Sequence, residues 1–176
     1  MRLVLIVAQS LDGFITRHDD PGVAWASAAD QKWFRSCLSE FDCSVTGRAT
    51  YEVIRDVVLA AKPNGRRRIV MTRQPERFSA DIRPGLLEFS AAEPPSIVAS
   101  LAASGGKNCA VLGGAQVHDA FLHAGLVDEI WTTIEPRIFG QGTPLVGRRH
   151  DLSLTLRDHQ RLPDSDSIVL RYTVQR

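Results

Sequence analysis

The sequence predicts an α/β fold: a central mixed sheet, mostly parallel, with helices on both faces and an antiparallel hairpin at the C-terminal end. Three observations support this prediction. A chain of 176 residues suits a single domain, here residues 1–176. Strand-like apolar segments alternate with helix-like segments, which is typical of parallel sheets. The last two strand-like segments follow each other across a short turn, as hairpin strands do.

The first strand is expected at Leu3–Ala8, because a continuous apolar run fits a central strand that is buried on both faces. The final hairpin combines two segments of alternating apolar and polar residues, 152–162 and 167–174, across the turn residues 163–166. The remaining strands are expected at 44–46, 69–72, 109–112 and 129–134, the last of them rich in β-branched and aromatic residues.

Helices are expected between these strands. Residues 28–41 carry their apolar side chains at helical spacing, and another helix is expected to start after Gly47. Two shorter helices are expected at 97–103 and 115–124, and Gly125 suits the end of the second.

Composition and charge exclude several classes of protein. With 21 basic and 20 acidic side chains the net charge is +1, which gives no indication of nucleic-acid binding. No segment approaches the ~18 apolar residues of a membrane span, and the apolar start is too short for a secretory signal. Cys37, Cys43 and Cys109 lack metal-site spacing, so we expect reduced thiols, no bound metal and a cytoplasmic protein.

Gly113 and Gly114 lie between a predicted strand and a predicted helix. Without side chains they allow a ligand to approach the backbone, and the first amides of the following helix suit a phosphate. A tight strand-to-helix turn explains the same pair equally well. The common nucleotide motifs GxGxxG and GxxxxGK[ST] do not occur in the chain.

Two further strand ends carry similar chemistry. One has Gly47-Arg48 with Thr50, and the other has Thr72-Arg73. A capped helix with Arg48 in solvent explains the first without a ligand. Ligands of α/β sheets bind at the carboxyl ends of parallel strands, so three such ends favour a dinucleotide. The two arginines suit the 2′-phosphate of NADP.

Asp30 is the most informative single residue. Helical spacing places it on the same face as Trp33, Phe34 and Cys37. An acid on an apolar face should have a raised pKa and can act as a proton donor. Residues 27–30, Ser-Ala-Ala-Asp, also form a helix-capping box, and spacing alone favours this capping role. The two roles can coexist.

Other polar residues have simpler interpretations. His118 is expected to be packed rather than to act as a base, and Asp12-Gly13 to form a turn. The run 66–68 of three arginines is expected to be solvated. The Gly/Pro-rich segment 136–144 is expected to be a loop that lines a site or an interface.

The order of these motifs resembles the dihydrofolate reductase superfamily, and within it the reductase domain of the riboflavin-biosynthesis deaminase-reductase. The matching pieces cover nearly the whole chain. They are Ser10-Leu11-Asp12-Gly13, Trp25 with Asp30 and Trp33-Phe34, Gly47-Arg48-x-Thr50-Tyr51-Glu52, Gly65-Arg66 leading into Ile69 to Gln74, Leu112 to Val117, Asp128 to Ile134, and Pro136 to Gly142.

This resemblance implies the three-layer dihydrofolate reductase-like fold and NADPH as the cofactor. Ala8 would contact the nicotinamide amide through its backbone. His118 stands where dihydrofolate reductases usually carry a tyrosine beside the nicotinamide ribose. In such proteins the peptide between the two glycines is often cis. The residues expected to hold the pyrophosphate and the adenosine phosphate are Gly47, Arg48, Thr50, Thr72, Arg73, Gly113, Gly114, Ala115 and Gln116.

The resemblance also shifts the interpretation of Asp30 towards function. In dihydrofolate reductases the matching acid supports protonation of the pterin and is hydrogen-bonded to the threonine that matches Thr132. The arginine that matches Arg66 pairs with the folate tail in those enzymes. The residues expected to wall the substrate pocket are Trp25, Phe34 and Thr132.

The expected function is NADPH-dependent reduction of a small heterocycle, most specifically of 5-amino-6-(5-phosphoribosylamino)uracil in riboflavin biosynthesis. The zinc signature of a deaminase half does not occur, so reduction alone is expected. Dihydrofolate reduction is the first alternative, a non-catalytic NADP-binding module the second, and an α/β domain without a dinucleotide site the third. The resemblance also favours a homodimer, and the loop 9–24 is expected to close over the pocket.

Overall fold

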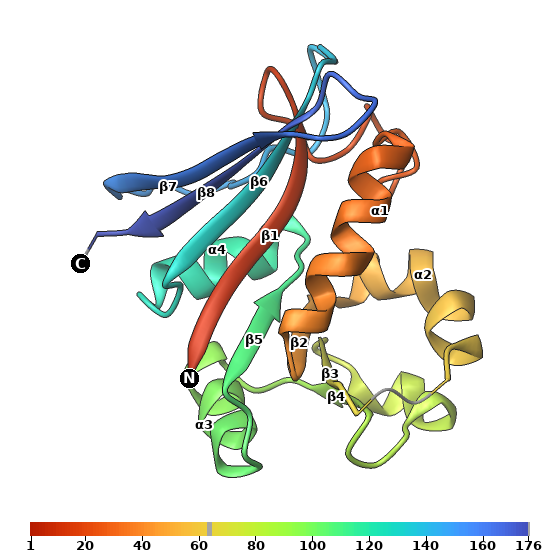
Figure 1. The fold of residues 1–176 in the computed structure, drawn as a ribbon. Coiled ribbons are helices and arrows are strands. Elements are labelled where there is room, and N and C mark those ends of the chain that lie inside the picture. The colour runs from red at the N-terminus through yellow and green to blue at the C-terminus, as the bar shows by residue number, and fades with distance from the viewer. Residues whose placement is uncertain (63–64, 176) are drawn as a thin grey trace.

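In the computed structural model, which describes residues 1–62 and 65–175, eight strands form one sheet (Figure 1). Their order across the sheet is β4-β3-β2-β5-β1-β6-β8-β7. The strands are β1 (Arg2–Ser10), β2 (Cys43–Gly47), β3 (Arg67–Met71), β4 (Leu87–Ser90), β5 (Asn108–Val111), β6 (Glu129–Glu135), β7 (Leu154–Arg161) and β8 (Ile168–Val174).

The strands β1 to β6 pair in parallel, whereas β8 pairs antiparallel with β6 and β7 antiparallel with β8. This pattern confirms the predicted mixed, mostly parallel sheet and the terminal hairpin. Strand β7 of the hairpin is the outermost strand of the sheet. Because the first six strands run in one direction, their carboxyl ends lie along the same edge of the sheet. That edge is where the predicted ligand-binding residues belong.

Helices cover both faces of the sheet, as predicted (Figure 1). Side chains alternate along β1, so Leu5 packs against α3 and α4 while Val4 packs against α1. Tyr51 of α2 packs against Val70, which shares the face of Val4. The helices are α1 (Ala28–Cys37), α2 (Arg48–Ala60), α3 (Pro94–Ala103) and α4 (Ala115–His123).

The boundaries differ from the prediction in a few places. The helix expected at 28–41 ends at Cys37 and continues as a short 3-10 helix, Leu38–Glu40. The helix expected at 97–103 starts at Pro94, because proline fits the first helical turn. The strand β4 and the 3-10 segment Pro75–Asp81 were not predicted. No helix in the described part of the chain is long and apolar enough to cross a membrane.

Candidate functional site

The carboxyl ends of β2 and β5 meet at a contact between two glycines. The Gly47 amide donates a 2.6 Å hydrogen bond to the Gly113 carbonyl oxygen, and the Thr46 hydroxyl donates to the same oxygen at 2.9 Å. A Cβ on Gly114 would lie 3.5 Å from Thr50 Oγ1. The contact therefore places the first turn of α2 beside the first turn of α4.

Both of these helices begin with open amides. Gly47 and Gly114 occupy the N-cap positions, and neither helix start has a side-chain cap. Ala115 and Gln116 lie in the first turn of α4, where the Gln116 side chain is exposed. Uncapped N–H groups and the positive ends of two helix dipoles together suit an anion such as a pyrophosphate.

Gly113 has no room for a side chain. Its φ is +92°, and a Cβ would lie 2.7 Å from His118 Nε2. The Gly113–Gly114 peptide is cis, as the family resemblance implies. His118 is buried with Nδ1 3.3 Å from the Leu145 carbonyl oxygen, and burial lowers its pKa to about 4. The neutral imidazole therefore packs against Gly113, as expected.

Arginines follow the ends of β2 and β3, which are neighbours in the sheet. Thr72 and Arg73 come directly after β3, with the threonine buried and the Arg73 side chain exposed. Arg48 begins α2 and forms an ion pair with Glu52 at 2.7 Å. An exposed pair of this kind contributes about 1 kcal/mol at most, so Arg48 can exchange it for a ligand phosphate.

The start of α1 shows which part of Asp30 serves as a cap partner. Ser27 is the N-cap, and its hydroxyl oxygen accepts the Asp30 amide at 3.1 Å. In a full capping box the Asp30 carboxyl would accept the Ser27 amide in return. That amide instead donates to Glu135 at 3.1 Å. The cap uses only the backbone of Asp30, which leaves the carboxyl available for another role.

The Asp30 carboxyl is sheltered, with 5% of the residue exposed. Burial is the main cause that raises its pKa, the Thr133 hydroxyl lowers the pKa, and the charge of Glu135 raises it. The net pKa is raised, so Asp30 keeps its proton to a higher pH than an ordinary aspartate does. Such an acid can orient a polar ligand and deliver a proton.

The threonine that faces Asp30 is Thr133, and the prediction of Thr132 in this position was wrong. Side chains alternate along β6, and Trp131 packs with Val4 on the α1 side of the sheet, so Thr133 faces α1 and Thr132 faces α4. Thr133 lies close enough to stabilise the Asp30 carboxylate, without the geometry of a full hydrogen bond. The error arises because two consecutive threonines match the family motif equally well.

Trp25 packs against Ala8 near the end of β1. Its ring meets that of Phe139 edge-on, with the centroids 5.0 Å apart. The indole N–H is buried and has no acceptor among residues 1–62 and 65–175. A ligand beside Ala8 can accept this hydrogen bond. Phe34 is partly buried on α1, within the cluster that contains Val4.

Asp12 has a role that the sequence interpretation missed. Its carboxylate accepts the Ser10 hydroxyl at 2.6 Å, the Gly140 amide at 2.7 Å and the Phe139 amide at 3.1 Å. The Ser10 hydroxyl is the main cause that lowers the Asp12 pKa. These bonds fasten the start of the loop 9–24 to the loop 136–144. They thereby hold the ring of Phe139 against Trp25.

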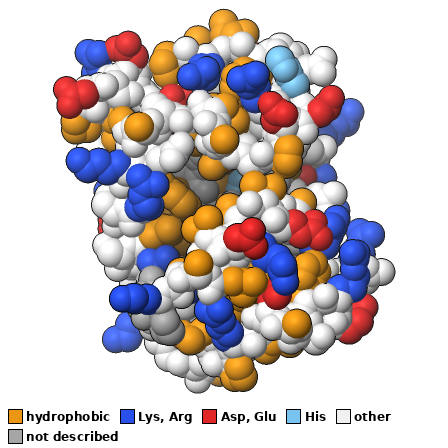
Figure 2. All heavy atoms as spheres, turned by 90° about the vertical axis from the view of Figure 1, so that its right-hand side faces the viewer, with side chains coloured by type: hydrophobic (Ala, Val, Ile, Leu, Met, Phe, Trp, Pro, Cys, Tyr) orange, Lys and Arg blue, Asp and Glu red, His pale blue; other side chains and the backbone are white. Residues whose placement is uncertain are grey.

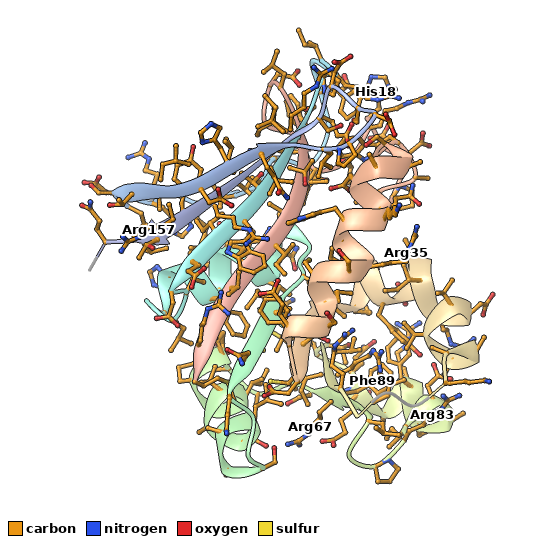
Figure 3. The ribbon with its side chains drawn as sticks, viewed as in Figure 1. His18, Arg35, Arg67, Arg83, Phe89 and Arg157 are labelled. Carbon is orange, nitrogen blue, oxygen red and sulfur yellow. The ribbon has the colours of Figure 1, made fainter. Side chains whose placement is uncertain are left out.

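Arg66 lies at the opposite end of α1 from Asp30. Its guanidinium donates to the carbonyl oxygens of Leu38 and Phe41, where α1 and its 3-10 extension end. A helix rise of about 1.5 Å per residue puts Leu38 about 12 Å from Asp30 along the axis. Figure 3 shows the neighbouring Arg67 at the lower end of the sheet. The structure therefore does not bring Arg66 together with Asp30 as a single pocket wall.

The molecular surface is hollowed on the side where α1 and α2 lie. Figure 2 shows this face with a depression near its middle, bordered by hydrophobic side chains, with both basic and acidic side chains farther out. The apolar border suits the aromatic part of a ligand.

Together, the sheet and this site define an α/β protein of the dihydrofolate reductase-like fold, with a sheltered acid and two uncapped helix starts at the carboxyl ends of its parallel strands. The chain belongs to the RibD C-terminal domain family, which it matches over residues 2–170. Among curated proteins, it is 25% identical over 151 residues to the uncharacterized protein YwjB of Bacillus subtilis, with 82% of each chain covered.

Solved structures share the fold. A pyrimidine reductase-like protein from Corynebacterium diphtheriae has a TM-score of 0.81 at 19% identity, with 99% of this chain and 92% of that one covered. A diaminohydroxyphosphoribosylaminopyrimidine deaminase/5-amino-6-(5-phosphoribosylamino)uracil reductase from Thermotoga maritima has a TM-score of 0.74 at 17% identity. That match covers 99% of this chain and 56% of the Thermotoga chain.

Proposed function

We propose that the protein is an NADPH-dependent reductase of a small heterocyclic substrate. The observation that carries this proposal is the hydrogen bond between Gly47 and Gly113, which joins two uncapped helix starts at the carboxyl edge of the sheet. Arg48 and Arg73 follow strands at the same edge, and guanidinium groups pair well with a 2′-phosphate. Membership of the RibD C-terminal domain family supports the same function.

Each part of the site has a role in this reaction. NADPH supplies the hydride when it is bound. The first amides of α2 and α4 would hold its pyrophosphate, and the backbone of Ala8 would hold the nicotinamide amide. The indole N–H of Trp25 and the carboxyl of Asp30 orient the substrate. Asp30 also provides the proton that the reduced product requires, while the contact of Trp25 with Phe139 keeps water out.

For the substrate we propose 5-amino-6-(5-phosphoribosylamino)uracil. Its ribosyl carbon would receive the hydride and the ring oxygen the proton, which opens the sugar to a ribityl chain. The name of the Thermotoga maritima neighbour includes the reduction of this compound, which supports the choice. The name also includes a deaminase, and the chain spans 56% of that protein, so our proposal covers reduction alone.

Dihydrofolate is the second candidate, because the order of the motifs resembles the dihydrofolate reductase superfamily. An elongated substrate with a terminal carboxylate would have to reach along α1 from Asp30 to the end near Leu38, about 12 Å away by helix rise, to meet Arg66. To bind such a tail, Arg66 would have to turn from the Leu38 and Phe41 carbonyls to which it donates.

The cofactor is tested by titrating the protein with NADPH and with NADH and following cofactor fluorescence. We expect Arg73→Ala to weaken NADPH binding about tenfold and to leave NADH binding unchanged, because one charge-assisted contact to the 2′-phosphate is lost. Arg157→Ala on β7, which lies far from this edge (Figure 3), is the matched control. A protein that binds neither nucleotide would refute the proposal.

The substrate is tested by oxidation of NADPH with the pyrimidine or with dihydrofolate. We expect turnover with the pyrimidine and a loss of about 10²–10³-fold in kcat/KM for Asp30→Asn, since a positioned general acid contributes on this scale. Faster turnover of dihydrofolate would select the second candidate. Binding of NADPH without oxidation by either substrate would indicate a non-catalytic module.

A further inference from the structure

Glu135, at the end of β6, is a buried carboxylate next to Asp30. It is 2% exposed and forms no ion pair with any described residue. Its oxygens accept three hydrogen bonds, from the Ser27 hydroxyl at 2.8 Å, the Ser167 hydroxyl at 2.9 Å and the Ser27 amide at 3.1 Å. Neutral donors thus satisfy the carboxylate without cancelling its charge.

Ser27 connects this carboxylate to the helix that carries the acid. Its hydroxyl gives its proton to Glu135, and the same oxygen accepts the Asp30 amide. Ser167 lies in the turn before β8, is fully buried, and is itself fixed by Ser165 at 2.8 Å. One carboxylate therefore joins the end of β6, the start of α1 and the tip of the terminal hairpin.

We propose that Glu135 is a positioning residue: it fixes the first turn of α1 through Ser27, and it places a negative charge beside the Asp30 carboxyl. The second half of this assignment acquires its catalytic meaning from the proposed reductase function. The first half, the fixing of α1, holds for any function of the protein.

The electrostatic part rests on which charged groups reach Asp30. From β6 the facing ionisable group is Glu135, and from α1 itself it is Cys37. Burial raises the Cys37 pKa to about 12, so the thiol carries no charge near neutral pH. The hydroxyl of Thr133 opposes Glu135, because it lowers the Asp30 pKa. A like charge in a poorly hydrated site disfavours ionisation of the acid.

The experiment is a pH titration of the protein alone, without cofactor or substrate, that follows the side-chain carboxyl carbons of Asp and Glu by 13C NMR. Glu135→Gln keeps the shape and an acceptor oxygen but removes the charge. We expect the Asp30 midpoint to fall by about 0.5 pH unit or more in this variant. Ser167→Ala, which removes one donor and keeps the charge, is the control and should shift the midpoint by less than about 0.2 unit. An unchanged Asp30 midpoint in folded Glu135→Gln would overturn the proposal.

Glu135→Asp decides the question if Glu135→Gln does not fold. It keeps the charge but withdraws the acceptor from Ser27, so the Ser27 amide should exchange with solvent about tenfold faster. Unchanged exchange of this amide would overturn the assignment.

A failure of this proposal can be told apart from a failure of the proposed function, because the titration needs no NADPH. Where NADPH oxidation is found, kcat/KM should decrease as the pH rises and Asp30 loses its proton. In Glu135→Gln this decrease should begin at a lower pH than in the wild type, by the same shift as the Asp30 midpoint. The KM for NADPH should stay unchanged. A variant that loses kcat equally at all pH values would show a structural role only, and would overturn the electrostatic part.

Discussion

The Gly47 amide and the Gly113 carbonyl oxygen, 66 positions apart along the chain, are joined by a 2.6 Å hydrogen bond between the ends of β2 and β5. Backbone atoms alone make this contact, so the helices that follow the two strands begin side by side. The packing beneath it is tight, because a Cβ on Gly47 would lie 3.1 Å from Val117 Cγ2. This contact between the two strand ends is therefore sensitive to the addition of a single methyl group.

The first prediction concerns the close packing of His118 against Gly113. Gly113→Ala should lower the free energy of unfolding by about 3 kcal/mol, because it combines a positive φ with a clash against the imidazole. Gly105→Ala is a matched control, since Gly105 has a φ of +90° and nothing within 4 Å of a Cβ. It should cost only about 1 kcal/mol. Urea unfolding measures both, and equal costs would contradict a steric role for His118.

The second prediction concerns the pH dependence of stability that His118 causes. Its pKa is lowered from 6.5 to about 4 by burial, so the unfolded chain binds more protons between these values. The stability that this group contributes is complete above pH 6.5 and is lost as the pH falls towards 4, about 3 kcal/mol in total. His118→Phe keeps an aromatic ring at this position and removes the nitrogen atoms that bind the proton. The difference in unfolding free energy between the two proteins should vary over this pH range, and a constant difference would refute the interpretation.

The fold was largely predictable because its strands carry local signals. The run Leu3–Ala8 needed to be apolar to lie between two layers of helices, and the alternation in 167–174 marks the second strand of the hairpin. In contrast, β4 has four residues, of which Leu87 alone is fully buried, so its sequence carries no pattern of its own. Pairing with β3 creates that strand, and a pairing partner cannot be seen in a local segment.

The candidate site divides in the same way. Gly47 and Gly113 were found because a glycine between a strand and a helix is a local feature. Glu135 and Asp12 were missed, because their partners lie 108 and 127 positions away, at Ser27 and Phe139. Hydrogen bonds over such separations leave no periodic pattern in a single sequence, and only the fold reveals them.

The third prediction concerns the stability that the folded protein loses when the buried Asp30 carboxyl ionises. The folded-state pKa of Asp30 is raised, mainly by burial, so its contribution to stability is complete below pH 3.8 and is lost as the pH rises through the folded-state value. Asp30→Asn should therefore raise the melting temperature at pH 8 by a few degrees and leave it nearly unchanged at pH 3. Scanning calorimetry at the two pH values tests this. A variant that is less stable than the wild type at pH 8 would show that the ionised carboxyl makes favourable contacts.

The last prediction concerns the link between the loop after β1 and the loop 136–144. Asp12→Asn should increase the hydrogen exchange of the Phe139 and Gly140 amides about tenfold, because the variant replaces a charged acceptor by a neutral one. The Ser10 hydroxyl and these amides lower the Asp12 pKa, so the wild-type link is complete above pH 3.8 and is lost as the pH falls through the lower folded-state value. Asp19→Asn, an exposed change in the same loop, should leave the exchange of both amides unaltered.

Because Phe139 packs on Trp25, the Asp12 variant should also shift the tryptophan emission. Unchanged exchange in Asp12→Asn would mean that the other hydrogen bonds between the loops, such as that from the Leu11 amide to the Arg137 carbonyl oxygen, hold them together without the carboxylate.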